Sequence, residues 1–293
     1  MISADALLAR QFPALEQSYS PKDAILYALS LGYGSDPVDP QELPFVYEKN
    51  LRVVPAMAAV LCSPGFWLSE PSLGANTAMI VHAQHAIEFL QPLAPAARLR
   101  GTMSVLEVID RGVGKGAMVI TERLLTDLAT DQAVARIVQH TLCRGDGGFS
   151  GREPTPGPPR QRVAPEESAP DWSVSLATLP QAALLYRLHA DLNPLHVDPE
   201  VARLAGFDRP ILHGLCTYGM VCRAVVQACL GGDAARMHSL AGQFTAPVVP
   251  GDTLQIDIWK GSAQDGRCTL KIRCAVPSRQ VVAFTNGAAV VSL

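Results

Sequence analysis

Residues 188–199, LHADLNPLHVDP, concentrate side chains that can exchange protons or bind a metal. His189, Asp191, His196 and Asp198 surround an Asn-Pro step in a chain that is 48% hydrophobic. A carboxylate and an imidazole that face one water molecule can take a proton from it and deliver another to carbon. Asp191 and His196 are therefore a candidate acid–base pair.

The Asn-Pro step disfavours continued helix at Asn193, so we expect Asp191 and His196 to bracket a tight turn. The Asn193 side-chain amide can hold that turn together or orient a catalytic group. Asp198 is followed by proline and is expected to be the N-cap of a short helix.

A second motif, RPILHGL, places His213-Gly214 at the start of a long apolar segment that ends at Gly232. We expect residues 214–232 to form a buried helix. The Gly214 N–H would then be an unpaired donor at the helix N-terminus, with no side chain to block approach. It can receive a carbonyl oxygen that becomes an oxyanion.

Two other interpretations remain open. His189-x-Asp191 and His196-x-Asp198 have a spacing that metal ligands can use, but Asp198 is better explained as a helix cap. No further Cys or His pair stands at ligand spacing, so we expect no metal. His189 is expected to be a packed polar residue, and His213 is either a packed histidine at the helix entry or part of the site.

The two halves of the chain can be aligned at a constant offset of 155 residues. AIEFLQPLAPAARL (residues 86–99) then lies opposite AGQFTAPVVPGDTL (residues 241–254), with five identities. Farther upstream, an additional proline pair coincides, and Asp36 faces Asp191. Seven coincidences at one offset indicate a duplicated domain.

The first copy lacks most of the proposed chemistry. Val38 stands opposite Asn193, Gln41 opposite His196, and Ala58-Ala59 opposite His213-Gly214. The duplication therefore predicts one active and one inactive half.

Between the halves, residues 145–170 carry six prolines and five glycines without apolar periodicity. Such a segment is typical of a linker. We predict a first domain over residues 1–144, a linker over 145–172 and a second domain over 173–293.

Each half contains two alternating apolar runs around a glycine-containing turn, at 102–110 and 117–125 and again at 253–260 and 268–276. This alternation predicts antiparallel strands. With the helix at 214–232, the expected class is α+β, one helix wrapped by an antiparallel sheet, twice over.

Composition excludes several classes of protein. The net charge of −3 and the charged fraction of 17% do not predict a basic surface that would bind nucleic acid or an anionic membrane. The seven cysteines include no C-x-x-C pair and are expected to be buried free thiols. No signal peptide or membrane helix is visible, and the final Val-Ser-Leu lacks the basic residue of a peroxisomal address, so we expect a cytoplasmic protein.

Residues 186–215, YRLHADLNPLHVDPEVARLAGFDRPILHGL, resemble the signature of the MaoC-like (R)-specific enoyl-CoA hydratases, the hydratase 2 group. That motif runs Y-R-x-S-G-D-x-N-P-x-H-x-D-P and then G-F-x-x-P-I-x-H-G. YALSLGYG, HAQHAIEFLQPLAP, IDRGVGKGA and GDGGFSG are similar to the N-terminal half of the two-domain hydratase of peroxisomal multifunctional enzyme type 2. The resemblance implies a double hot-dog fold with a degenerate first half that shapes the acyl pocket.

The resemblance also implies a reaction. Water would add reversibly and syn across a trans-2-enoyl-CoA to give the (R)-3-hydroxyacyl-CoA, with Asp191 and His196 as the catalytic pair and Gly214 as oxyanion donor. No cofactor is implied beyond the CoA of the substrate, and a homodimer is expected. Two alternatives stay open: a dehydratase acting on an acyl carrier protein or an unusual acyl-CoA, and a thioester-binding protein without turnover.

Substrate contacts implied by the family fall on both halves. They are Leu192, Asn193, Pro194, Leu195, His82, Ala83, Arg111 and Phe244. Arg111, with nearby Lys115, can pair with CoA phosphates or simply form a solvated turn. Where the family has Ser-Gly, this chain has His189-Ala190, and where the first half of the family has His-Gly, this chain has His82-Ala83. The methyl groups that Ala190 and Ala83 add are expected to affect the preferred acyl chain length and the turnover.

Overall fold

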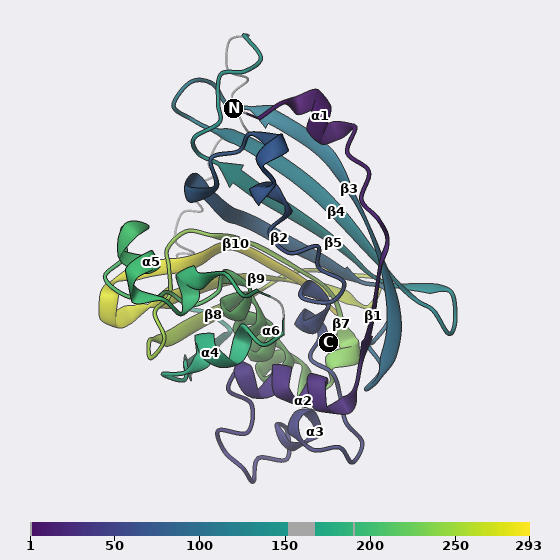
Figure 1. Cartoon of the computed structure of the whole chain (residues 1–293). Helices are drawn as coiled ribbons and strands as arrows, with labels where there is room; N and C mark the ends of the chain where they lie inside the picture. The colour runs from purple at the N-terminus through teal and green to yellow at the C-terminus, as the bar shows by residue number, and fades with distance from the viewer. Residues whose placement is uncertain (1, 152–167, 190) are drawn as a thin grey trace.

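The computed structural model describes residues 2–151, 168–189 and 191–293, and these form one antiparallel ten-stranded sheet with helices packed on it (Figure 1). The strands of the first half are β1 (Leu15–Tyr19), β2 (Ile80–Phe89), β3 (Ala97–Asp110), β4 (Ala117–Asp127) and β5 (Gln132–Cys143). Those of the second half are β6 (Trp172–Ala177), β7 (Met237–Phe244), β8 (Thr253–Gln264), β9 (Arg267–Val276) and β10 (Val281–Val291).

The strand order confirms the duplication. It runs β1-β3-β4-β5-β2-β7-β10-β9-β8-β6, so the second half repeats the first in reverse. The halves join where β2 pairs with β7, and there Ala86 lies opposite Ala241. The 155-residue offset relates these same two alanines, so the pair marks an approximate two-fold axis between the halves.

Both predicted strand pairs are present, and both are longer than predicted; in the first, β3 begins at Ala97 rather than at residue 102. β8 continues to Gln264 rather than ending at residue 260, because the turn is only two residues long. Asp265 and Gly266 both have positive φ, 50° and 74°, which matches the twist of the adjoining strands. Leu254, Ile256 and Ile258 of β8 are fully buried, as their alternation predicts.

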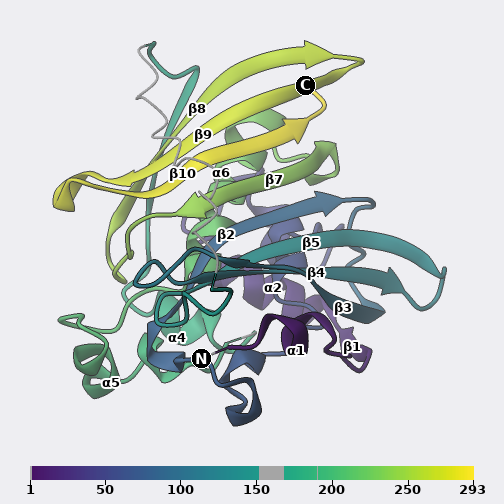
Figure 2. The ribbon, with the colours of Figure 1, turned by 90° about the horizontal axis from the view of Figure 1, so that it is seen from above.

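The predicted buried helix is α6 (Gly214–Leu230), which ends at left-handed Gly231. The second-half sheet curves around it (Figure 2). On its other side lies α2 (Pro21–Ser30) from the first half. At Gly219 a Cβ would come within 2.6 Å of Leu31 and 3.1 Å of the Tyr27 hydroxyl, so only glycine permits this approach.

The first half has no comparable helix among the described residues. The segment opposite the start of α6 is the short 3-10 helix η1 (Pro55–Ala59), and positive φ at Cys62 followed by Pro64 prevents its extension. The expectation of one long central helix in each half is therefore met only in the second. The inner face of the first-half sheet is covered instead by η1, α1 (Ala4–Leu8) and short 3-10 turns.

The remaining helices are short. They are α3 (Leu43–Val46), α4 (Ala182–Tyr186), α5 (Pro199–Leu204), η2 (Trp67–Ser69), η3 (Pro71–Leu73), η4 (Thr77–Met79), η5 (Pro194–His196), η6 (Ala234–Arg236) and η7 (Pro277–Arg279). No helix in the described parts of the chain is long and apolar enough to cross a membrane. All seven cysteines are free, and six are buried, as expected.

Most of the predicted linker, residues 152–167, lies outside the described residues. Its first residues pack against the β3–β4 turn, where a Cβ at Gly147 would fall 2.2 Å from the Gly112 carbonyl oxygen. At the other end, β6 already begins at Trp172. The proposed domain limits otherwise stay a prediction.

Candidate active site

The turn that carries Asp191 and His196 is closed by Asn193. Its backbone N–H donates to Asp191 Oδ1 at 2.9 Å, and its side-chain Oδ1 accepts from the Leu195 N–H at 3.0 Å. The second bond caps η5, which ends at His196. Asn193 thus fixes the separation of the two residues, in line with its predicted structural role.

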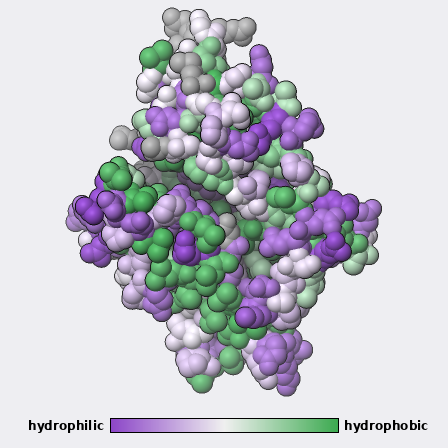
Figure 3. Space-filling view, viewed as in Figure 1, coloured by the Kyte–Doolittle hydropathy of each residue, from purple (hydrophilic) through white to green (hydrophobic). Residues whose placement is uncertain are grey.

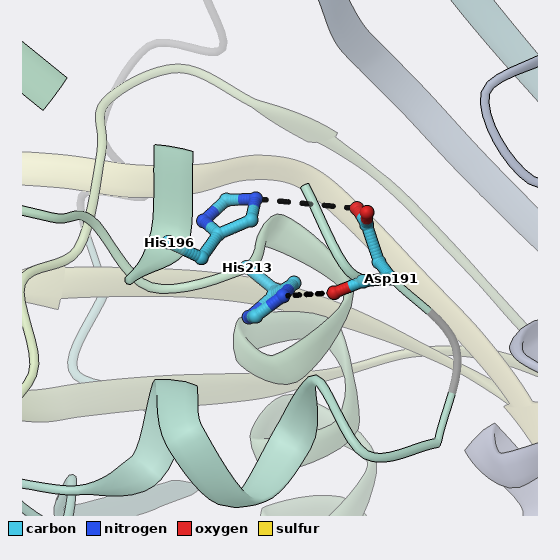
Figure 4. A group of neighbouring side chains, drawn as sticks. All are labelled: Asp191, His196 and His213. Carbon is cyan, nitrogen blue, oxygen red and sulfur yellow. Dashed lines mark hydrogen bonds and ion pairs between the residues drawn. The ribbon is translucent and has the colours of Figure 1, made fainter. Parts of the chain in front are cut away.

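His196 is buried, and the bond made by one ring nitrogen sets the function of the other. Its Nδ1 lies 2.8 Å from the Ile211 carbonyl oxygen, which can only accept, so Nδ1 carries the proton. The Nε2 lone pair faces the Asp191 carboxylate, with 4.0 Å between Nε2 and Oδ2 (Figure 4). This gap is long for a direct hydrogen bond and suits one shared water molecule.

His213, the N-cap residue of α6, supports both members of the pair. Its Nε2 donates to the Asp191 backbone oxygen at 3.1 Å (Figure 4). Its ring stacks on that of His196, with centroids 3.7 Å apart. His213 is both a packed histidine and a neighbour of the candidate site, so both interpretations of the sequence apply.

Burial makes the two imidazoles neutral near pH 7. It lowers the pKa of His196, and the Asp191 carboxylate only partly opposes this. It also lowers the pKa of His213 to about 4, with a further contribution from His196. A neutral His196 can accept a proton at Nε2, as an acid–base role requires.

Gly214 begins α6, and no acceptor among the described residues binds its backbone N–H. The ring of Phe244 packs over it, 3.4 Å from where a Cβ would be. Phe244 in turn contacts His82 of β2, with ring centroids 5.0 Å apart. The fold therefore brings together three predicted site residues from distant parts of the sequence.

Other predicted substrate contacts are less well connected to this centre. Leu192 is 68% exposed. A hydrophobic surface area lies over α4, which precedes this segment in the chain (Figure 3). Pro194 is exposed and Leu195 half-buried. Ala83 is the extra residue of a bulge in β2.

Arg111 lies in the β3–β4 turn, where its N–H donates to the Gly116 carbonyl at 3.1 Å, and none of its described contacts reaches Asp191 or His196. The pairing of Arg111 and Lys115 with CoA phosphates stays a prediction. Ala190, where a methyl was expected to affect turnover, lies outside the described residues.

Asp191, His196 and His213 offer possible metal-ligand atoms within 4.8 Å of one another. The two imidazoles, however, are stacked with only 28° between their planes. Imidazole binds a metal through a lone pair in the ring plane, so two stacked rings do not aim at one point. Asp198 caps α5 as predicted, accepting from the N–H groups of Glu200 and Val201, and does not belong to this group.

Several supporting residues were not found from sequence. Ile211 fixes the His196 tautomer through its carbonyl oxygen, which no side-chain pattern reveals. The ring of Tyr186 packs against that of His213, with centroids 5.1 Å apart. It also contacts His189, which packs against Tyr186 and Tyr27 as the sequence predicted for a packed polar residue. The Tyr-Arg that opens the motif was the available signal for Tyr186.

Comparison with known proteins gives the family. Residues 17–145 match the domain described as "MFE-2 hydratase 2 N-terminal domain", and residues 162–280 match "MaoC like domain". Enoyl-CoA hydratase ChsH3 of Mycobacterium tuberculosis is 38% identical over 293 residues, covering 98% of this chain and 97% of that protein. The chain belongs to the MaoC-like hydratase 2 family.

Other members of this family agree with the fold. The peroxisomal enoyl-CoA hydratase 2 of Arabidopsis thaliana is 35% identical, covering 88% of this chain and 87% of its own. The crystal structure of a MaoC-like dehydratase from Phytophthora capsici superimposes with a TM-score of 0.80 at 30% identity, covering 98% of each chain. The double hot-dog fold expected from the resemblance is confirmed for this MaoC-like chain.

Proposed function

We propose that the protein catalyses the reversible hydration of a trans-2-enoyl-CoA to the (R)-3-hydroxyacyl-CoA. The observation that carries the proposal is the 4.0 Å gap between His196 Nε2 and Asp191 Oδ2, beside the free N–H of Gly214. Relatives named as hydratases and as a 3-hydroxyacyl-thioester dehydratase support the same reaction in its two directions.

In the proposed step, a water held between Asp191 and His196 attacks C3 of the enoyl group. One water proton passes to the pair, the new C–O bond forms, and the electrons of the C2–C3 double bond move toward the thioester oxygen. The pair then delivers a proton to C2 on the same face, which restores the thioester. General acid–base catalysis of this kind contributes about 10²–10⁴-fold.

Gly214 would stabilise the negative charge that develops on the thioester oxygen. Its N–H lies at the N-terminus of a 17-residue helix, where unpaired donors and the helix dipole favour an anion. His213 would act as a positioning residue, since its ring supports His196 and its Nε2 holds the Asp191 backbone. The proposal needs no metal or redox group.

The test is to mix chelator-treated protein with short- and medium-chain trans-2-enoyl-CoA and follow loss of the conjugated enone absorbance. An (R)-specific and an (S)-specific dehydrogenase then assign the product. Metal-independent formation of the (R) product is expected. No turnover on any CoA ester, with acyl carrier protein substrates accepted instead, would contradict the CoA assignment, and binding without any turnover would contradict the enzyme assignment.

Cytoplasmic location and a homodimer also stay predictions. Size-exclusion chromatography with light scattering would measure the assembly directly, and a monomer mass near 31.2 kDa would contradict the homodimer.

A further inference from the structure

A row of polar side chains crosses the inner face of the first-half sheet. Thr121 of β4 lies opposite Gln139 of β5, which lies opposite His85 of β2. These residues point inward, because Ile137 and Ile87, two positions along β5 and β2, are buried in the hydrophobic core. We call Thr121, Gln139 and His85 the polar row.

The second half shows that the fold does not require such a row. The inner-facing residues of its sheet include Leu240, Leu270, Ile272 and Phe284, all buried and apolar. They pack on α6, the helix for which the first half has only η1 as a counterpart. Polar side chains in the first half therefore need an explanation beyond folding.

Two buried side chains, one in the row and one beside it, have nitrogen atoms without hydrogen-bond partners among the described residues. His85 is 1% exposed, and neither ring nitrogen has a hydrogen-bond partner among the described residues. Burial keeps its pKa well below the ordinary value, so the ring is neutral and offers one donor and one acceptor.

The second group is Arg123 of β4, which is 8% exposed and follows Thr121 on the same face. One of its amino groups donates to the Ala59 carbonyl, but its Nε has no partner. No carboxylate lies within ion-pair distance of it in the described structure. Burial lowers its pKa to about 10, which still leaves it charged at pH 7. Buried cations are ordinarily paired with anions.

The row is continuous with the candidate active site. Phe244, which covers Gly214, lies 5.0 Å from His82, and His82 lies 5.1 Å from His85, measured between ring centroids. The pKa of His82 is lowered to about 4, mainly by burial; among the smaller contributions Asp191 raises it and Arg123 lowers it. The charges of Asp191 and Arg123 therefore both act on His82. A substrate whose thioester lies at Gly214 would reach the row by passing the rings of Phe244 and His82.

We propose that the polar row and Arg123 select an acyl group that carries an oxygen function beyond the enoyl unit, a hydroxyl, keto or carboxylate oxygen that accepts hydrogen bonds. The inference rests on the proposed hydratase function and names its substrate class. A plain alkyl chain would leave the ring nitrogens of His85 and the Nε of Arg123 without partners, whereas an oxygen could accept hydrogen bonds from them.

The experiment compares wild-type kcat/KM on trans-2-enoyl-CoA substrates of equal chain length that end in a methyl, a hydroxyl, a keto or a carboxylate group, over a series of lengths. At one length, at least one oxygen-bearing substrate should exceed its methyl counterpart by about tenfold or more. Preference for carboxylate would identify Arg123 as the main partner, and preference for hydroxyl or keto would identify His85 and Gln139.

Variants then test the residues themselves. His85→Leu, Gln139→Leu and Arg123→Met should each reduce the ratio of oxygen-bearing to methyl-ended kcat/KM. Because both rates come from one preparation, the ratio is independent of the amount folded. His140→Gln is the matched control, since His140 adjoins Gln139 but lies on the opposite face of β5, and its ratio should stay at the wild-type value.

The outcomes separate the two proposals. Hydration of methyl-ended substrates at rates equal to or above the others, at every length, would overturn this inference and leave the hydratase function standing; the row would then hold only water. Absence of hydration of every substrate, including the short crotonyl-CoA, would overturn the proposed function itself.

Discussion

The two halves of the molecule share a backbone turn but not the chemistry attached to it. Asp191 Oδ1 accepts from the Asn193 N–H at 2.9 Å, and at the corresponding positions of the first half Asp36 Oδ1 accepts from the Val38 N–H at 3.1 Å. The turn is thus a property of the duplicated fold. What distinguishes the second half is the imidazole that faces the carboxylate, where the first half has Gln41.

A pocket lies at the position that corresponds to the candidate active site under the duplication. Its volume is about 430 Å³, and residues of both halves line it, among them Ala58, Phe89 and Met237. At the 155-residue offset these three correspond to His213, Phe244 and His82. The pocket therefore has alanine and methionine where the candidate active site has two histidines.

The largest expected difference between the halves is tested with two variants, Asp191→Asn and Asp36→Asn. Asparagine keeps the oxygen that closes each turn but cannot exchange a proton, so Asp191→Asn should lower kcat by about 10²–10⁴-fold. CoA-ester binding, measured by calorimetry, should change little. Asp36→Asn is the control and should retain wild-type kcat; equal losses in both variants would indicate a structural role for both aspartates.

His196→Gln installs in the second half the residue that the first half carries. The amide can fill the space but is not basic, so we expect kcat to fall by about 10²–10³-fold. Gln41→Ala should leave the rate unchanged. A pH–rate profile adds a check, because loss of the acid limb in His196→Gln would assign that limb to His196, whereas an unaltered profile would contradict its role as the titrating group.

Gly214→Ala likewise mimics the first half, where Ala59 is the counterpart. The added methyl would meet Phe244 at 3.4 Å, an ordinary contact, so the protein should fold. It would also crowd the approach to the N–H, and kcat/KM should fall by about tenfold or more. For Gly219→Ala we expect the reverse: the clash with Leu31 should lower the melting temperature, whereas kcat/KM of the folded protein should stay near the wild-type value. Normal kcat/KM in Gly214→Ala would remove Gly214 from the mechanism.

Stability should fall on acidification because histidines are buried neutral around the site. His82 and His213 have pKa values of about 4 in the folded state against 6.5 as the ordinary value. Their folded pKa is lowered, so their contribution is complete above about pH 6.5 and is lost as pH falls toward 4. The free energy of unfolding from urea titrations should drop by roughly 2 kcal/mol per histidine by pH 5. His82→Gln should show a shallower decline, and an identical decline would contradict this assignment.

The smallest effect is expected for Asp198→Ala. This change removes the side chain that caps α5 and should lower the free energy of unfolding by about 1 kcal/mol. Because Asp198 acts as a cap and not as a ligand, kcat should stay near the wild-type value. A large loss of turnover, restored by added zinc, would instead favour the metal interpretation.

Much of this organisation follows from local sequence. The Asn-Pro turn, the Asp198 cap, the buried helix from Gly214 and the four long hairpin strands each depend on neighbouring residues or on simple alternation. The duplication supplied the long-range information, because one offset aligned whole domains rather than single residues.

The polar row could not be found in this way. Thr121, Gln139 and His85 become neighbours only through the registers of β4, β5 and β2, and each is unremarkable in its own strand. The shortening of the first-half helix to η1 was likewise missed, because the segment after Pro55 is as apolar as a buried helix. Hydrophobic patterns indicate burial, but they do not indicate which strand will lie opposite or where a helix will stop.

The pairing of β2 with β7 has a consequence for synthesis of the chain. β2 is complete long before β7 leaves the ribosome, and until then one long edge of the first-half sheet has no partner. The approximate two-fold axis passes between Ala86 and Ala241, and Gln84 lies opposite Gln243, the counterpart of Glu88. A second copy of β2 would therefore fit this edge in the register of β7, with Gln84 opposite Glu88. Two nascent chains can therefore pair through β2 before β7 is available. Pairing of β7 with β2 then also prevents association of one new molecule with another.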